Sequence, residues 1–214
     1  MKTHDLIGAL AQDHEAHPVP QPLSWTFLGA MAAGFGIAVI AFALTLGIRP
    51  DVASAIQTWR YDFKFVVTLT LAVTSARLVW RLARPATDTR SAGLGLLAAP
   101  LLLCGAVLYE LWVIPAGGWL PRAIGSNSVA CVASITLLSI APLAAAFYAL
   151  RHGAPLNPGL AGAAAGLLAS ALAATLYAMH CPDDSPLFGA VWYTIAMTLV
   201  AVAGGAAGRR FLRW

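Results

Sequence analysis

Charged residues are scarce in this sequence. Only 10% of its 214 residues are Asp, Glu, Lys or Arg, and 59% are hydrophobic, whereas a soluble domain carries about 25% charged residues. The mean hydropathy of +0.75 reflects the same imbalance. A surface with so little charge excludes an ordinary soluble domain and predicts a protein that is solvated by lipid.

Two further absences exclude other classes of function. The formal charge of +4 comes from basic residues that stand singly between apolar blocks, so the chain has no basic stripe for direct binding of nucleic acid. The three cysteines include no Cys-x-x-Cys pair, which argues against a thioredoxin-like or quinone-linked thiol oxidase. Direct nucleic-acid binding and dithiol redox catalysis are therefore not expected.

Six apolar blocks cover most of the chain. Each is close to the ~20 residues that cross a bilayer core. Backbone groups inside a bilayer must bond within their own segment, so each block is expected to be a helix. The sequence therefore predicts an all-α polytopic membrane bundle of six transmembrane helices in residues 23–214, preceded by a short segment, residues 1–22. The blocks are Trp25–Ile48, Phe63–Trp80, Ala92–Ile114, Ser128–Leu150, Gly159–Met179 and Leu187–Gly208.

The basic residues are distributed unevenly between the two sides of this bundle. With the N-terminus in the cytoplasm, nine lie on the inner side and four on the outer side, which agrees with the positive-inside rule. Both termini are therefore expected in the cytoplasm, in a multi-pass protein of a bacterial inner membrane. The outer four are Arg49, Arg60, Lys64 and Arg122; the inner nine are Lys2, Arg77, Arg81, Arg84, Arg90, Arg151, Arg209, Arg210 and Arg213.

The first 22 residues have the pattern of a short amphipathic helix on a stiff tether. Thr3 can cap a helix, and Leu6, Ile7 and Leu10 share one face of it. The proline-rich residues 18–22 then form a spacer to the first block. Such a helix suits the groove of a partner protein. The alternative is a helix on the membrane surface, although the segment is acidic and the inner leaflet repels acids.

Two of the three cysteines fall at one membrane level. Cys131 lies at the outer start of the fourth block, and Cys181 lies in the short outer loop between the fifth and sixth blocks. The outer side of a bacterial inner membrane is oxidising, so these two thiols can form a disulfide. The alternative is that they only pack as small apolar side chains. Cys104 lies in the middle of a span, where we expect it to be buried by packing.

The loop that carries Cys181 is the most distinctive segment. His180, Cys181, Asp183 and Asp184 belong to residue types that bind metals. Cys131, Cys181 and His180 are the candidate metal ligands. One His-Cys pair does not make a metal site, so the alternative is a rigid loop, bounded by two prolines, with solvated acids.

Glu110 is an ionisable residue in the outer third of the third block. At the bilayer centre such a residue costs on the order of 2.5–3.5 kcal/mol, so we expect it to face protein or water. It either supports the function of the neighbouring loop or makes a satisfied packing contact. A small metal or solute transporter would use Glu110 with His180, Cys181 and Asp183, but the inner halves of the blocks offer few polar residues to continue such a path.

Several segments spread along the chain match the pattern of one family. The most specific is Tyr177–Phe188, continued by Val191–Thr194. The others are Met1–Ile7 with the proline spacer, Gly47–Asp51, Arg81–Pro85, Val129–Cys131 and Ser139–Leu143. Together these segments resemble the NrsF family of membrane anti-sigma factors, which are negative regulators of extracytoplasmic-function sigma factors.

This resemblance implies a function as well as a fold. It implies six spans and a short cytoplasmic N-terminal region that sequesters a sigma factor, for which Leu6, Ile7 and Leu10 are the candidate contacts here. It also implies two outer-face cysteines that are needed for a stress response, and these carry over to Cys131 and Cys181. The protein is then an inhibitor and not an enzyme, with no cofactor. Oxidation or soft-metal binding at the two cysteines would release the sigma factor.

Overall fold

The computed structural model describes residues 3–5, 7–8, 23–84 and 87–212. Every regular element in these ranges is a helix, which confirms the all-α prediction. Six stretches are long and apolar enough to cross a membrane, and their ends lie within a few residues of the predicted blocks. They are α2 (Leu23–Thr45), α4 (Trp59–Leu82), α5 and α6 (Arg90–Val113), α8 and α9 (Ser128–Arg151), α10 (Pro158–Ala178), and α11 to α12 (Pro186–Phe211).

Prolines divide two of these stretches. The third consists of α5 (Arg90–Gly95) and α6 (Ala98–Val113), and the fourth of α8 (Ser128–Leu138) and α9 (Ile140–Arg151). A proline has no amide proton to donate to the carbonyl four residues earlier. Pro100 stands four residues after Leu96, which lies in the first break, and Pro142 stands four residues after Leu138, the last residue of α8. The missing hydrogen bond therefore falls at or next to each interruption.

The last stretch has an unusual start. It consists of α11 (Pro186–Phe188), a π-helical turn (Gly189–Tyr193) and α12 (Thr194–Phe211). Single π turns inside helices occur frequently at functional sites. Three shorter elements connect the spans: α3 (Val52–Ala55), a 3-10 turn (Ala116–Gly118) and α7 (Trp119–Ile124).

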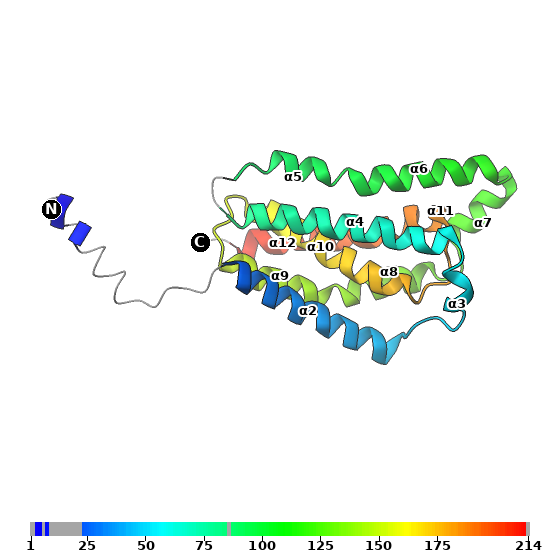
Figure 1. Cartoon of the computed structure of the whole chain (residues 1–214), viewed down its shortest axis with the longest axis horizontal. Coiled ribbons are helices and arrows are strands. Elements are labelled where there is room, and N and C mark those ends of the chain that lie inside the picture. The colour runs from blue at the N-terminus through cyan, green and yellow to red at the C-terminus, as the bar shows by residue number, and fades with distance from the viewer. Residues whose placement is uncertain (1–2, 6, 9–22, 85–86, 213–214) are drawn as a thin grey trace.

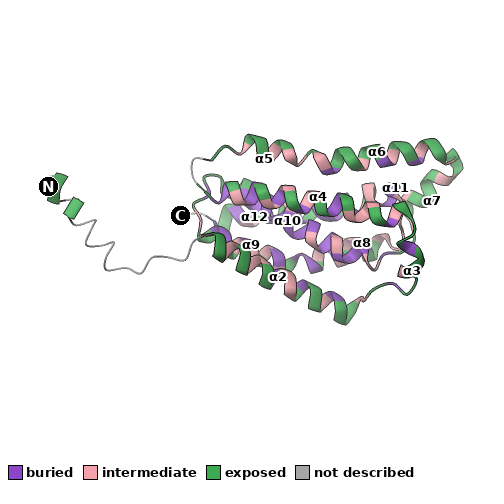
Figure 2. Ribbon diagram, viewed as in Figure 1, coloured by how far each residue is buried: buried purple, intermediate pink, exposed green. Residues whose placement is uncertain are grey.

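Helix α10 forms the centre of the bundle. It packs on α12, α4, α9 and α8, and most of its side chains are buried (Figures 1 and 2). The backbone of Gly162 lies directly against the backbones of Gly204 and Gly208 on α12, and a Cβ atom at Gly162 would collide with the carbonyl oxygen of Gly204. Small residues therefore bring α10 and α12 together within one chain, by the close approach that glycines permit in membrane helices.

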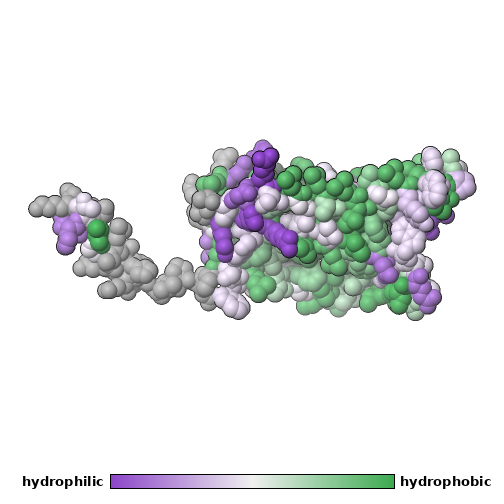
Figure 3. Space-filling model, turned by 45° about the horizontal axis from the view of Figure 1, so that its top comes forward, coloured by the Kyte–Doolittle hydropathy of each residue, from purple (hydrophilic) through white to green (hydrophobic). Residues whose placement is uncertain are grey.

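The α5–α6 stretch lies at the edge of the bundle (Figure 1). Helix α6 packs on α4 and α11, and its outward face exposes large apolar side chains, among them Leu101 and Leu108. Figure 3 shows the corresponding surface, an apolar middle with hydrophilic residues at both ends of the molecule. Such a surface is what a bilayer core with two polar interfaces requires.

The two ends of the bundle differ in what they hold. We call the end with Thr45, Trp59, Val113 and Pro186 the cysteine end, and the opposite end the terminal end, because α2 begins and α12 finishes there (Figure 1).

Residues 3–5 and 7–8 are helical, and the side chain of Ile7 is exposed. Leu6, Leu10 and the proline spacer lie outside the described residues.

Candidate functional site

The structure brings the two predicted cysteines into one buried cluster at the cysteine end. Cys131 lies in α8, while Cys181 lies in the loop between α10 and α11, and neither side chain is exposed. Both thiols are free. They pack in the same core cluster as Tyr177, Phe188 and Tyr193. We call residues 179–185 the Cys181 loop.

The Cys181 thiol is shielded from water. Burial raises its pKa above the ordinary value for a thiol. The Tyr177 side chain packs in the same cluster, and the thiol lies 3.9 Å from the carbonyl oxygen of Asp183. Because the thiolate is the reactive form of cysteine, a thiol in this environment reacts slowly while the Cys181 loop stays in place.

Two cations hold the Cys181 loop by its backbone. Arg49 Nη1 and Lys64 Nζ donate to the carbonyl oxygen of Cys181, at 3.2 and 3.0 Å. Both side chains are only 9% exposed, and both pair with the Asp184 carboxylate, at 2.9 and 2.6 Å. Charge-assisted hydrogen bonds of this kind are stronger than neutral ones, so the loop is fastened to α4 and to the segment that follows α2.

Arg49 also reaches a third partner. Its Nε and Nη2 donate to the two carboxylate oxygens of Asp51, at 2.7 and 2.6 Å. This hydrogen bond keeps the pKa of Asp51 below its usual range, and the same pairing raises the pKa of Arg49. The planar guanidinium thus serves three acceptors at fixed angles, which an ammonium group could not do.

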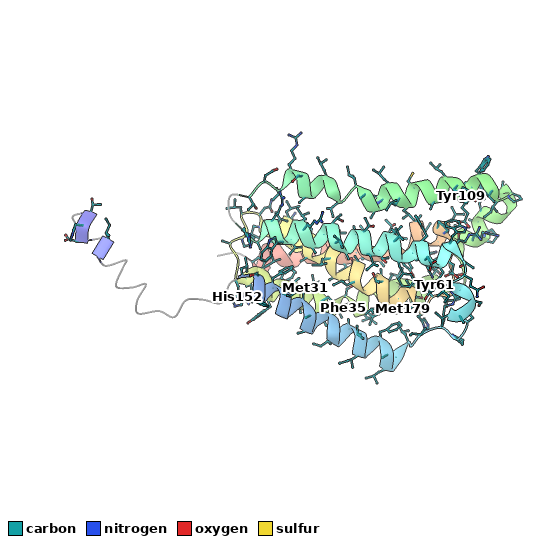
Figure 4. All side chains as sticks on the ribbon, in the orientation of Figure 1. Met31, Phe35, Tyr61, Tyr109, His152 and Met179 are labelled. Carbon is teal, nitrogen blue, oxygen red and sulfur yellow. The ribbon has the colours of Figure 1, made fainter. Side chains whose placement is uncertain are left out.

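The end of α2 is joined to the same loop through its backbone. Gly47 has a positive φ of 67°, as is common where a helix ends. The Gly47 carbonyl oxygen lies 3.1 Å from His180 Nδ1, and the Arg49 amide donates to the Met179 carbonyl oxygen at 3.1 Å. Figure 4 shows Met179 and Tyr61 at this end of the bundle. The Cys181 loop and the residues that follow α2 are therefore joined by two hydrogen bonds.

Asp183 connects the loop to the helix that carries Cys131. Its carboxylate accepts from the backbone amides of Ser126 and Asn127, at 3.0 and 3.1 Å, and from the Ser126 hydroxyl at 3.1 Å. These residues immediately precede α8. The two cysteines are thus linked by a short polar bridge as well as by the core in which they pack.

Glu110 faces protein, as expected from its place in a span. The side chain is fully buried, and its carboxylate pairs with Arg60 and Arg122, at 3.3 Å each. It also accepts from the Ser185 hydroxyl at 2.8 Å and from the Leu187 amide at 3.4 Å. Glu110 thereby ties α6 and α7 to the start of α11, beside the Cys181 loop.

Comparisons with known proteins assign this arrangement to a family. A family model described as "NrsF: Negative regulator of sigma F" matches residues 10–214. The chain belongs to the NrsF family. It is 36% identical over 219 residues to "Anti-sigma-F factor NrsF" of Caulobacter vibrioides, and 33% identical over 224 residues to "Probable anti-sigma-F factor NrsF" of Azospira oryzae. Each match covers the full length of both chains. No solved structure matches the chain significantly.

Membership of the NrsF family favours a regulator of transcription over a transporter. The family consists of anti-sigma factors, which are regulators of transcription and not enzymes. This agrees with the function inferred from the sequence and favours it over the transporter alternative.

Within the parts of the chain that the structure describes, no group of three or more His, Cys, Asp and Glu side chains is arranged to hold a metal ion.

The expectation for Cys104 was wrong. Its side chain is exposed on the outside of α6 and is not buried by packing. The sequence places this cysteine in mid-span but does not indicate which face of the helix meets lipid, because the block is apolar on every side. Cys104 thus lies on the surface of this NrsF-family protein, away from the buried pair.

Sequence reasoning also missed the cations that hold the site. Arg49, Arg60, Lys64 and Arg122 were used only to orient the chain, yet all four pair with acids at the cysteine end. A signal was available: these four basic residues were predicted on the same side of the membrane as five acids, Asp51, Asp62, Glu110, Asp183 and Asp184. Four bases and five acids at one interface indicate a network of ion pairs.

Proposed function

We propose that this protein holds an extracytoplasmic-function sigma factor at the bacterial inner membrane and releases it when Cys131 and Cys181 react. The N-terminal segment, residues 1–22, is the proposed sigma-binding element, with Leu6, Ile7 and Leu10 as its apolar contacts. The observation that carries the proposal is the junction between the Cys181 loop and α2, because α2 follows the N-terminal segment directly in the chain.

The direction of insertion follows from the distribution of charge. The described basic residues at the terminal end include Arg81, Arg84, Arg151, Arg209 and Arg210, and the positive-inside rule assigns such an end to the cytoplasm. An even number of spans then keeps both termini in the cytoplasm. In this orientation the N-terminal segment meets the sigma factor, and the two cysteines are on the oxidising side.

Reaction at the cysteines gives the proposed signal. An oxidant or a soft metal must enter a cluster that is closed to water, so the reaction requires the Cys181 loop to open. Once the two sulfurs are joined to each other or to a metal, their spacing changes and the loop cannot return to its original contacts. A tenfold release of the sigma factor requires about 1.4 kcal/mol. A disulfide contributes ~2–4 kcal/mol, so the chemical event is large enough.

Helix α2 is suited to carry this signal across the membrane. It packs mainly on α9, and few of its residues are buried. One end is held by the Cys181 loop through Gly47 and Arg49, and the other end leads to the N-terminal segment. A rigid helix with few other contacts can move as a unit. The loop-bound and loop-free positions of α2 are the two states that the reaction would select between.

The N-terminal contact can be tested directly. The full chain is expressed together with an extracytoplasmic-function sigma factor of the same bacterium, and the complex is isolated from membranes. Leu6→Asp and Leu10→Asp should each abolish co-purification, because a carboxylate on the apolar face is not tolerated in a groove. Deletion of residues 3–16 should give constitutive transcription from the target promoters.

Asp13→Asn serves as the matched control, because it changes a nearby charge and leaves the apolar face intact. It should retain the sigma factor. Membrane levels of every variant are measured in the same samples. If both leucine variants still retain the sigma factor, the proposed binding face is wrong; if the unchanged protein does not retain it, the anti-sigma proposal fails.

A further inference from the structure

A groove runs along the outside of the bundle between α10 and α12. It has a volume of about 710 Å³ and begins at the terminal end, where α10 starts and α12 finishes. Its floor contains small residues, among them Gly159, Ala163 and Gly205, and its α12 edge carries the exposed residues Val202 and Ala206. Because the floor has so few large side chains, a hollow is left on a surface that faces lipid.

The groove is about as long as one membrane leaflet is thick. It extends along α12 from Thr198 to Arg209 and along α10 from Pro158 to Leu167. At about 1.5 Å per residue, each of these segments is roughly 15 Å long, which is half of a ~30 Å hydrocarbon core. Among the lining residues that the structure describes, only Asn157, Thr198 and Arg209 are polar. One acyl chain of a lipid in the adjoining leaflet therefore fits the groove.

Arg209 lies at the end of the groove that meets the membrane interface. Its side chain rests against the first turn of α10, where a Cβ atom on Gly159 would come within 3.1 Å of Arg209 Nε. Within the described residues, the Arg209 side chain makes neither an ion pair nor a hydrogen bond. The positive end of the α10 dipole lies at the same place. Both features favour an anion at this end of the groove.

The acids of the described chain do not neutralise this charge. None of the described residues that line the groove is acidic. Asp88, the one described acid in the connections between spans at the terminal end, accepts from the Arg90 amide at 2.9 Å. Arg210, which follows Arg209, is exposed. Because like charges repel, an ammonium headgroup is disfavoured beside two arginines, whereas an uncharged glycerol headgroup is not. The charge therefore favours an anionic phospholipid over a zwitterionic one.

A second copy of this chain is a poorer occupant of the groove. Two copies inserted in one membrane share one orientation, so a symmetric contact through this groove would place both Arg209 side chains at the same depth and close together. Their like charges would repel. The closest helix contacts, those of Gly162 and Gly166 with the α12 backbone, are already made inside the chain. The groove is thus better suited to a lipid than to a second copy.

We propose that this groove binds an anionic phospholipid from the leaflet at the terminal end, with the lipid phosphate at Arg209 and one acyl chain between α10 and α12. The planar guanidinium can donate two hydrogen bonds to a phosphate, and such charge-assisted bonds are strong. The proposed topology makes this the cytoplasmic leaflet, which contains anionic lipids. The binding does not depend on the sigma-factor proposal and can be measured without a sigma factor.

Photolabelling of the purified full chain tests the site. A phosphatidylglycerol probe with a diazirine in the middle of one acyl chain is irradiated with the protein in maltoside detergent, and the labelled peptides are identified by mass spectrometry. The label should saturate and should map to α10 and α12 around Ala163, Leu167 and Val202. Unlabelled phosphatidylglycerol should compete, whereas phosphatidylethanolamine and dioleoylglycerol should compete at least tenfold more weakly.

Two variants, each with a matched control, test the two parts of the site. Arg209→Gln removes the charge at the interface end and should raise the half-saturating probe concentration about tenfold. Arg151→Gln, at an exposed arginine of the same end that lies outside the groove, should have little effect. Ala206→Phe fills the groove and should abolish saturable labelling. Ala203→Phe, at an exposed position of α12 outside the groove, should leave the labelling intact. Size-exclusion profiles and thermal unfolding verify the fold of all four.

Four results would overturn the proposal. One is labelling that does not saturate or that falls equally on the outward face of α6, around Leu101 and Leu108. Another is an equal loss of affinity in Arg209→Gln and Arg151→Gln, which would mean that the lipid responds only to the total charge of this end. The third is competition by phosphatidylethanolamine as strong as by phosphatidylglycerol. The last is a dimer in detergent that Ala206→Phe abolishes, which would assign the groove to a second copy of the chain.

Discussion

Arg49 Nη1 donates to both carboxylate oxygens of Asp184, at 3.0 and 2.9 Å, although the two residues are 135 positions apart in the chain. The pair joins the segment that follows α2 to the Cys181 loop. It is the side-chain counterpart of the backbone contacts that Gly47 and Arg49 make with His180 and Met179.

Arg49→Gln should loosen the Cys181 loop. The substitution removes hydrogen bonds to two carboxylates and to the Cys181 carbonyl oxygen, so the free energy of unfolding in detergent should fall by about 2 kcal/mol. Thermal unfolding measures the change. Arg210→Gln, at an exposed position on the terminal end, is the control and should leave stability unchanged. Equal effects of the two substitutions would contradict the role assigned to Arg49.

Gly162→Ala should separate α10 from α12. The new methyl group meets the backbone of Gly204, which cannot move aside as a side chain could. Overpacking of this kind costs about 1–3 kcal/mol, and thermal unfolding would show it. Gly105→Ala is the matched control because nothing lies within 4 Å of its new Cβ atom. That control should be neutral or gain about 0.5–1 kcal/mol from helix propensity.

The alkylation rate of Cys181 should depend on pH in an unusual way. An ordinary thiol has a pKa near ~8.5, so its rate levels off above that pH. Burial raises the pKa of the Cys181 thiol, so the alkylation rate of Cys181 should go on increasing above the pH at which an ordinary thiol levels off. For the same reason, the free energy of unfolding should fall as the pH rises through this range, because Cys181 loses its thiol proton at a lower pH in the unfolded state than in the folded state. The rate is measured in a Cys104→Ser, Cys131→Ser background, and the same protein in SDS should show the ordinary plateau.

The sensing hypothesis predicts a pattern among cysteine variants. Cys131→Ser, Cys181→Ser and the double variant should all uncouple target transcription from oxidant or cadmium to the same degree, because one lost thiol removes a disulfide or a shared metal. Cys104→Ser should respond normally, since Cys104 lies on the outside of α6, apart from the buried pair. Normal induction in the double variant would return Cys131 and Cys181 to a packing role.

The proposed topology has a separate test. Reporter fusions at His152 and after Trp214 should be active in the cytoplasm, and fusions at Asp51 and Asp183 should be active in the periplasm, as the distribution of basic residues indicates. An inverted pattern would place both cysteines on the reducing side and would remove the basis for a periplasmic signal.

The six spans and their boundaries could be predicted because they depend on local properties. A block of apolar residues such as Pro158–Ala178 must be helical in lipid, whatever surrounds it. Proline and arginine mark the ends of such blocks for equally local reasons. The resemblance to the NrsF family also depends on short segments, of which Tyr177–Phe188 is the most specific. Fold class, family and the candidate cysteines therefore follow from the sequence by itself.

The contacts between spans required the tertiary structure. Hydrophobicity does not indicate which face of a membrane helix meets protein, because lipid and protein interior are equally apolar; Cys104 was misplaced for this reason. Likewise, no local rule pairs Arg49 with Asp184 or assigns Glu110 to two arginines, since these partners come together only when the helices pack. The sequence determined which residues lie at the cysteine end, and the packing of α4, α6, α8 and α10 decided which of them hold the Cys181 loop in place.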